Sequence, residues 1–198
     1  MHEYAAIIIV ARIVMLASNS RAAAMGQELR LCPLVDLSFM GLTCVEEAEL
    51  MEPRTDCTGS PPRTGRSGRY LSPALRLANN CLRDASGVRQ LADTLLETPQ
   101  LLTWLDLSFN RLESVPVDEL MGLSSLRTLY LHANRLDGLE QVAGLRSCDG
   151  LRSLTLQGNP LCATPDYRQG VLQAIPQITS LDFCRVLPSE RTPQWSSV

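Results

Sequence analysis

A pattern of leucines and asparagines that recurs along the chain constrains the fold more than any other feature of the sequence. Residues 102–112 read L-x-x-L-x-L-x-x-N-x-L, and the same spacing returns at residues 126–136 and 151–161. A shortened copy occupies residues 75–82, and a copy without its asparagine starts at Ile178. A repeat of roughly 20 to 50 residues indicates a solenoid, in which each repeat buries its apolar face against the next.

The residue types of the pattern explain how each repeat folds. Side chains alternate across a strand, so the leucines of Leu-x-Leu point into the solenoid and the residues between them point out onto a concave sheet. The asparagine turns the chain out of the strand, and its amide pairs backbone groups in the bend. We therefore expect a structural asparagine ladder at Asn80, Asn110, Asn134 and Asn159. Three full copies at near-constant spacing argue against a chance leucine pattern in a helical protein.

The segments between the strands predict short convex elements. Residues 88–96 have apolar residues at helical spacing, with Ser86 as the expected N-cap and Pro99 beyond the end. Residues 116–121 and 140–145 predict single helical turns, and the apolar positions of 171–175 predict a helix that covers the last repeat. The expected fold class is therefore α/β, a solenoid with about five parallel strands on a concave sheet, short helices or turns on the convex side and a helical C-terminal cap.

Four segments are expected along the 198 residues. Residues 1–30 are predicted to be a disordered extension. Residues 31–70 hold a degenerate cap strand, which starts at Leu34, and a linker rich in proline, glycine and arginine. Residues 71–187 form the repeat domain with its C-terminal cap, and residues 188–198 are predicted to be a disordered tail.

Two of these segments leave alternatives open. Residues 1–24 are an unstructured extension, a targeting segment, or the product of a start upstream of Met25. Their apolar run is interrupted at Arg12, which leaves it far short of the ~20 residues of a membrane span. In the linker, Thr64 and Ser67 lie among arginines, so residues 53–70 are either a solvated loop or a phosphorylation or docking site.

Composition excludes several function classes. The net charge is −3 and the chain contains no lysine, so a bulk electrostatic case for nucleic acid and a lysine-dependent phosphate loop are both excluded. The seven cysteines include no C-x-x-C pair, and only two histidines are present, so we expect reduced thiols, no metal site and no cofactor. His132 lies one strand away from Asp106, but no motif places a nucleophile near them, so we expect no catalysis.

The residues between the leucines form three rows across the predicted concave sheet. Trp104 lies in the first row, Asp106 and Tyr130 in the middle row, and His132 and Cys184 in the third. Tryptophan, tyrosine and arginine dominate binding hot spots, although Trp104 could instead pack on its neighbours across the sheet. The residues that we expect to contact a partner are Arg76, Trp104, Asp106, Thr128, Tyr130, His132, Thr155, Gln157 and Asp182. Alanine at Trp104 and Tyr130 together is then expected to abolish binding with little change in melting temperature.

The repeats resemble the short leucine-rich repeats of the phosphatase-regulator-like class. The run from Asn159-Pro160 through Tyr167-Arg168 to Leu181-Asp182 is similar to the C-terminal cap of that class. A more specific likeness, to one family of small leucine-rich repeat proteins, rests on residues 34–56 and their Glu52-Pro53-Arg54-Thr55 run, and covers about residues 30–187. The resemblance implies a non-enzymatic protein of the cytoplasm, with an association with the cilium or axoneme.

Three functions are consistent with these observations. The first is a protein–protein interaction module or scaffold, and the second is a regulatory subunit of a phosphatase or other enzyme complex. The third is an RNA-associated adaptor, although the acidic pI and the single arginine on the sheet argue against direct RNA contact. We expect a monomer that binds protein partners, with no small-molecule substrate, no direct nucleic-acid contact and no membrane contact.

Overall fold

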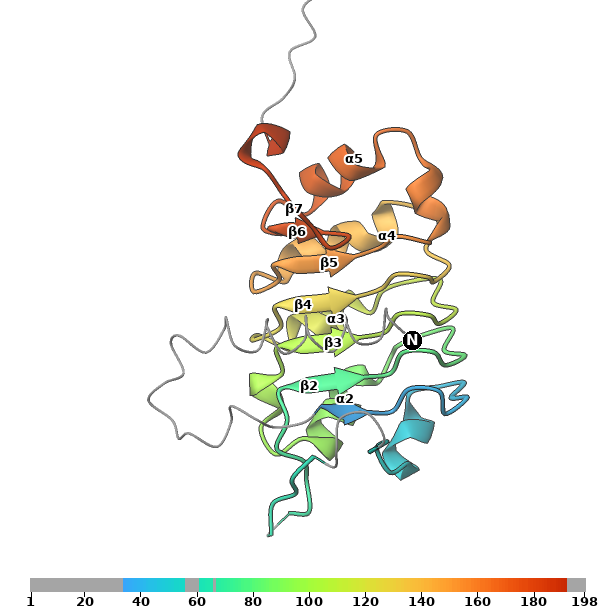
Figure 1. The fold of residues 1–198 in the computed structure, drawn as a ribbon, viewed down its shortest axis with the longest axis vertical. Helices are drawn as coiled ribbons and strands as arrows, with labels where there is room; N and C mark the ends of the chain where they lie inside the picture. The colour runs from blue at the N-terminus through green and yellow to red at the C-terminus, as the bar shows by residue number, and fades with distance from the viewer. Residues whose placement is uncertain (1–33, 56–60, 66, 192–198) are drawn as a thin grey trace, which may run out of the picture.

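Six parallel strands stack in chain order into one curved sheet (Figure 1), in a computed structural model that describes residues 34–55, 61–65 and 67–191. The parallel strands are β1 (Val35–Asp36), β2 (Ala74–Arg76), β3 (Trp104–Asp106), β4 (Thr128–Tyr130), β5 (Ser153–Thr155) and β6 (Ser180–Leu181). A last strand, β7 (Cys184–Arg185), pairs antiparallel with β6. The predicted solenoid is confirmed, and the degenerate cap strand is β1. The predictions for residues 1–30 and 192–198 lie outside the described residues.

One row of inward leucines runs through the solenoid in register. Leu75, Leu105, Leu129, Leu154 and Leu181 pair with one another on successive strands, and all are fully buried. Identical repeats pair in register because a one-residue slip would turn every leucine to the other face of the sheet. Burial of each of these side chains contributes about 1.5 to 3 kcal/mol, so this row helps to hold the repeats together.

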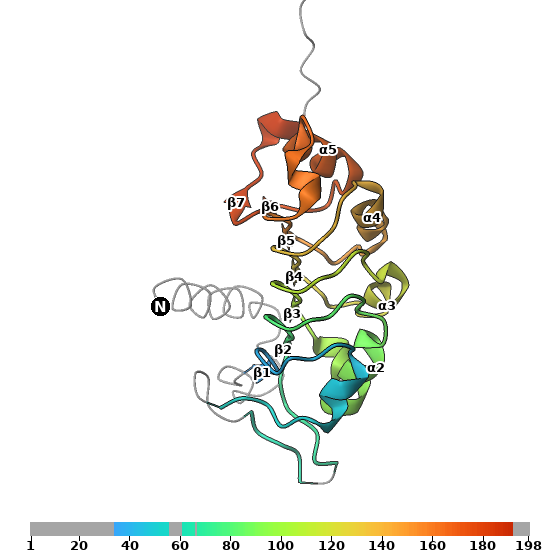
Figure 2. The same ribbon diagram turned by 90° about the vertical axis from the view of Figure 1, so that its right-hand side faces the viewer.

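Short helices cover the convex side of the sheet (Figure 2). They are α2 (Val88–Leu95), α3 (Val117–Met121), α4 (Glu140–Ala143) and α5 (Tyr167–Ala174), with 3-10 helices at Glu46–Leu50, Pro99–Leu101, Gly144–Ser147, Pro160–Ala163 and Pro188–Arg191. The predicted N-cap of α2 was wrong, because Gly87 in a left-handed conformation takes that position instead of Ser86. The carboxylate of Glu119 in α3 accepts the backbone N–H groups of Gly87 and Arg89, which a serine cap would not both satisfy.

The C-terminal cap forms as predicted and extends further than expected. Val171 and Leu172 of α5, together with Ile175, are buried against the last repeat. Pro188–Arg191 form a 3-10 helix instead of starting a disordered tail, because Arg168 of α5 pairs with Glu190.

A further backbone contact lies at each edge of the six parallel strands. At the first edge, the N–H of Arg54 donates to the carbonyl of Asp36 in β1 at 2.7 Å, and at the other edge β7 pairs with β6. The segment predicted as a linker also contacts the solenoid, because the buried Tyr70 donates its N–H to the carbonyl of Leu95 at 2.7 Å. No helix within the described ranges is long and apolar enough to cross a bilayer.

Candidate functional site

Two of the three outward rows predicted for the concave face are confirmed by the register of strands β2 to β6. Arg76, Asp106, Tyr130 and Thr155 pair in one row, which Asp36 of β1 extends. Trp104, Thr128, Ser153 and Ser180 pair in a second row beside Ala74. Cys184 does not join the third row, because the chain reverses after β6 and places this residue in the antiparallel strand β7.

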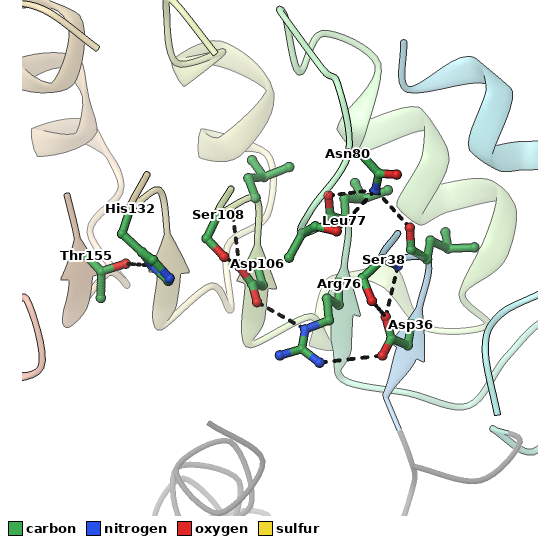
Figure 3. Close-up of polar contacts among 12 residues, drawn as sticks. Asp36, Ser38, Arg76, Leu77, Asn80, Asp106, Ser108, His132 and Thr155 are labelled. Carbon is green, nitrogen blue, oxygen red and sulfur yellow. Dashed lines mark hydrogen bonds and ion pairs between the residues drawn. The ribbon is translucent and has the colours of Figure 1, made fainter. Parts of the chain in front are cut away.

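A buried ionic triad occupies the N-terminal end of the middle row (Figure 3). Arg76 Nε lies 3.2 Å from Asp106 Oδ2, and Arg76 Nη1 lies 3.5 Å from Asp36 Oδ2. All three side chains are buried, so each charge depends on its partners instead of on water. One guanidinium therefore joins three successive strands, and the triad carries one excess negative charge.

Each carboxylate of the triad also fixes the turn that follows its strand. Asp36 accepts the N–H and the hydroxyl of Ser38, at 3.0 and 2.6 Å. Asp106 accepts the same groups of Ser108, at 3.0 and 2.5 Å. The residue after each serine, Phe39 or Phe109, then adopts a positive φ of 59° or 53°, so both phenylalanines are placed by the same Asp-x-Ser turn.

The asparagine ladder forms as predicted and joins successive repeats. The side-chain oxygen of Asn134 accepts the N–H of Leu112 at 3.0 Å, and its amide nitrogen donates to the carbonyls of Leu107 and Leu131, both at 3.0 Å. Asn80, shown in Figure 3, Asn110 and Asn159 make the corresponding bonds. These four buried residues satisfy backbone groups in the bends and leave no side-chain atom for a partner.

Trp104 and Tyr130 are far less accessible than we expected. Each is 1% exposed, and they form one buried cluster with Leu34 and Ala74. The two rings pack edge to face, with centroids 5.4 Å apart, and the Arg76 guanidinium lies 5.9 Å from the Trp104 ring centroid. Nε1 of Trp104 is buried without a hydrogen-bond acceptor in the described part of the chain. Their role in partner binding stays a prediction, but the packing alternative accounts for their contacts.

His132 is buried between the triad and the C-terminal repeats. Its Nδ1 lies 2.8 Å from Thr155 Oγ1 (Figure 3). Burial lowers the pKa of His132, and Arg76 acts in the same direction, whereas the carboxylates of Asp106 and Asp182 act in the opposite direction. A neutral imidazole bonded to a threonine hydroxyl is suited to packing.

Two half-exposed phenylalanines, which the sequence reasoning missed, flank His132 at the ends of the strands. Phe109 is 49% exposed and its ring centroid lies 5.1 Å from that of His132. Phe183 is 45% exposed, and its ring centroid lies 5.3 Å from that of Tyr130 and 5.8 Å from that of His132. We call Phe109 and Phe183 the aromatic rim. The signal that could have found Phe109 is its place after the strand pattern, outside the three rows. Phe183 occupies an inward leucine position of the copy that starts at Ile178, and the expectation that it is buried was wrong because β6 ends at Leu181 and the chain turns there.

The remaining predicted residues divide between the surface and the interior. Gln157 is exposed, whereas Thr128 and Thr155 are buried. Asp182 is half-buried, and its carboxylate accepts the N–H groups of Leu156 and Gln157 and the hydroxyl of Tyr167. Of the predicted residues, Gln157 is therefore the one that is exposed and near the aromatic rim, while Asp182 fastens the C-terminal cap.

Within the described ranges, no group of three or more histidine, cysteine, aspartate or glutamate side chains could hold a metal ion. The described cysteines, which are Cys44, Cys81, Cys148, Cys162 and Cys184, are free thiols. The concave face thus carries a cluster of packed aromatic rings, one buried ionic triad and the half-exposed aromatic rim.

Comparisons with known proteins agree with this architecture. A family model described as leucine rich repeat matches residues 100–161. Leucine-rich repeat-containing protein 51 of Macaca mulatta is 42% identical over 161 residues, which cover 81% of this chain and 82% of that protein. The Homo sapiens protein of the same name is 41% identical over the same shares. A crystal structure of the Drosophila melanogaster SNF/U2A' complex holds a chain with a TM-score of 0.52 at 23% identity, covering 67% of this chain and 72% of that one, and shows likeness of fold alone.

Proposed function

The chain belongs to the family of leucine-rich repeat-containing protein 51, and we propose that it is a protein-binding module whose partner docks on the aromatic rim of the concave sheet. Leucine-rich repeat families are in general protein-interaction modules, which supports the first part of this proposal. The second part rests on one observation, which is that Phe109 and Phe183 are half-exposed while the aromatic residues beside them are buried.

The rim has the physical properties of a binding hot spot. An aromatic ring on the surface offers a large apolar area, and its burial in an interface removes that area from water. Both rings are held by edge-to-face contacts with His132, so little conformational freedom is lost when a partner binds. Both residues also have positive φ values, 53° for Phe109 and 62° for Phe183. For Phe109 this conformation belongs to a turn that recurs at Phe39, Asn79 and Ala133, so the turn fixes the direction of the ring.

The rim also explains how a partner could bind without reaching the buried row. Gln157 is exposed and offers an amide donor and an acceptor, and its backbone N–H bonds Asp182, the neighbour of Phe183 in the chain. Tyr130, which packs on Trp104, contacts the Phe183 ring. A partner with apolar side chains and free hydrogen-bonding groups, as in an amphipathic helix or a peptide segment, fits this surface.

The test is a pull-down with the full chain as bait from a lysate of ciliated cells. The test variant carries Phe109→Asn and Phe183→Asn, because asparagine is polar and tolerates positive φ. The matched control carries Leu101→Ser and Met121→Ser, which remove two apolar residues of similar exposure, 42% and 48%, from outside the rim. We expect the control to keep the partners of the wild-type chain and the rim variant to lose them, with similar melting temperatures. A rim variant that captures the same partners as wild type would overturn the proposal.

We also propose a scaffold role in the cytoplasm with enrichment at the cilium or axoneme, which is supported by the sequence resemblance alone. Imaging of a tagged chain in ciliated cells tests it, and a diffuse signal without ciliary enrichment would count against it. The same pull-down separates the two other functions considered for the sequence. Phosphatase activity in the eluate would indicate a regulatory subunit, and RNA that dissociates with increasing salt would indicate an RNA-associated adaptor.

A further inference from the structure

The loop between Arg63 and Tyr70 takes no part in the proposed binding surface, yet it is built around two hydroxyl groups. The N–H of Thr64 donates to the carbonyl of Arg69 at 2.8 Å, and the N–H of Gly68 donates to the carbonyl of Thr64 at 3.0 Å. Gly68 has a φ of 70°, which suits glycine in this tight turn. Ser67 is exposed in the turn, whereas Thr64 is half-buried.

One carboxylate holds the turn to the solenoid. Glu97 Oε2, just beyond helix α2, accepts the hydroxyl of Ser67 and, at 3.2 Å, the hydroxyl of Thr64. Beside it, the N–H of Glu97 donates to the carbonyl of Tyr70 at 3.0 Å. The side-chain and backbone contacts of Glu97 therefore both fasten the loop at the same place.

On its other side, the loop faces the N-terminal cap across a small cleft. The cleft has a volume of about 210 Å³, and its lining includes Ser67, Arg63, Arg69 and Glu52. Arg63 forms an ion pair with Glu52, and its guanidinium lies 4.5 Å from the ring centroid of Tyr70. Tyr70 donates its hydroxyl to Glu52 at 3.1 Å. Ser67 thus shares one cleft with the guanidinium groups of Arg63 and Arg69 and the carboxylates of Glu49 and Glu52, and it hydrogen-bonds a further carboxylate on the solenoid.

We propose that Ser67 is a phosphorylation site, and that its phosphate releases the loop from Glu97 and occupies the cleft beside Arg63 and Arg69. In this reaction a kinase transfers the γ-phosphoryl group of ATP to Ser67 Oγ. The bond from the γ-phosphorus to the bridging oxygen breaks, ADP leaves, and the hydroxyl proton passes to the catalytic base of the kinase. Arginines on both sides of Ser67 suit a kinase that recognises basic substrates.

A phosphate on Ser67 would be repelled by one neighbouring side chain and attracted by another. A phosphoserine carries a charge of about −1.5 to −2 at neutral pH, so it repels Glu97, which now accepts the Ser67 hydroxyl. The same charge attracts Arg63, which is now paired with Glu52. Phosphorylation therefore weakens the contact of the loop with Glu97 and the ion pair of Arg63 with Glu52 in the cap. Thr64 is the less suitable acceptor because it is half-buried in the turn.

The experiment incubates the full chain with a basophilic serine/threonine kinase and magnesium-ATP, then locates the phosphate by tandem mass spectrometry. We expect one phosphoryl group in residues 61–71, on Ser67, and none in that loop for Ser67→Ala. Amide hydrogen exchange then measures the consequence, and we expect the amides of Tyr70 and Glu97 to exchange about tenfold faster while those of β3 to β5 are unchanged.

Glu97→Gln provides the matched control for the repulsion, because glutamine still accepts a hydrogen bond but carries no charge. In this variant we expect Ser67 to be phosphorylated as before, with a smaller acceleration of exchange. The proposal is overturned if the loop takes no phosphate, or if Thr64 is modified instead. It is equally overturned if full phosphorylation of Ser67 leaves the Tyr70 and Glu97 amides unchanged. None of these results bears on the aromatic rim, so the two proposals succeed or fail separately.

Discussion

Trp104 of β3 and Tyr130 of β4 pack edge to face on the concave side of the sheet, with their ring planes at 79°. Both residues are almost completely buried, so they stabilise the fold whether or not a partner touches them. The expectation that alanine at both positions leaves the melting temperature nearly unchanged therefore does not follow from the structure. This is the reason for testing partner binding at the aromatic rim instead.

We predict that Trp104→Ala lowers the free energy of unfolding by about 3 to 5 kcal/mol, as expected for the loss of a buried aromatic side chain. Trp104→Phe should cost much less, because it keeps an aromatic ring and removes the indole N–H that lacks an acceptor in the described part of the chain. Urea denaturation of both variants measures the difference. Equal stability of Trp104→Ala and wild type would show that the side chain is not packed in solution.

Arg76 should be as important for stability as a core leucine. Replacement by methionine leaves the buried carboxylates of Asp36 and Asp106 without their shared cation, so we expect a loss of about 3 to 5 kcal/mol. Adding Asp106→Asn to Arg76→Met should recover part of the loss, because one of the two charges is then absent. Denaturant titrations of the single and double variants decide the point, and a double variant less stable than Arg76→Met would contradict it.

The asparagine ladder gives a prediction with a neighbouring control. Asn134→Ala leaves the N–H of Leu112 and the carbonyls of Leu107 and Leu131 without that partner, so we expect a loss on the order of 3 kcal/mol. Asn79 has a φ of 57° and no side-chain hydrogen bond within the described ranges. Asn79→Gly should therefore be close to neutral in the same urea titration. Similar losses in the two variants would mean that the ladder bonds are not the cause.

His132 predicts how stability depends on pH. Its pKa in the folded chain lies below the ordinary value of 6.5, so the unfolded chain takes up the proton first as the pH falls. The contribution of His132 is therefore complete above pH 6.5 and is lost progressively as the pH falls below it. We expect wild type to lose more stability than His132→Gln between about pH 7.5 and pH 5.5. Parallel slopes for the two proteins would show that His132 is not the group responsible.

The strand register could be predicted because it depends only on the repeat. Leu105 and Leu129 occupy the same motif position, so their neighbours Trp104 and Thr128, or Asp106 and Tyr130, had to lie in matching rows. Accessibility could not be predicted in the same way. The alternation of side chains along a strand predicts the face to which Trp104 points. The exposed fraction of Trp104 depends instead on segments that are distant in the sequence, such as the one that holds Leu34 in the same buried cluster.

The rim was missed for a different physical reason. Phe109 and Phe183 follow their strands in left-handed turns, where period-two alternation no longer holds and the direction of a side chain depends on φ. Ser86 was predicted as the N-cap of α2 from local residue preference, whereas the cap is the Glu119 carboxylate, which belongs to the next repeat. The local sequence pattern therefore does not predict the contacts that one repeat makes with the next.

The number of stacked strands sets a limit on the length of partner that the concave face can hold. At the two edges of the sheet lie the two-residue antiparallel strand β7 and the Arg54 contact with β1, and edges this short disfavour pairing with another chain. Five parallel pairings, each about 4.8 Å wide, give the concave face a span of about 24 Å. A helix lying across all six strands would therefore engage about 16 residues, and an extended segment about seven. Any longer partner must leave the surface at one of its two ends.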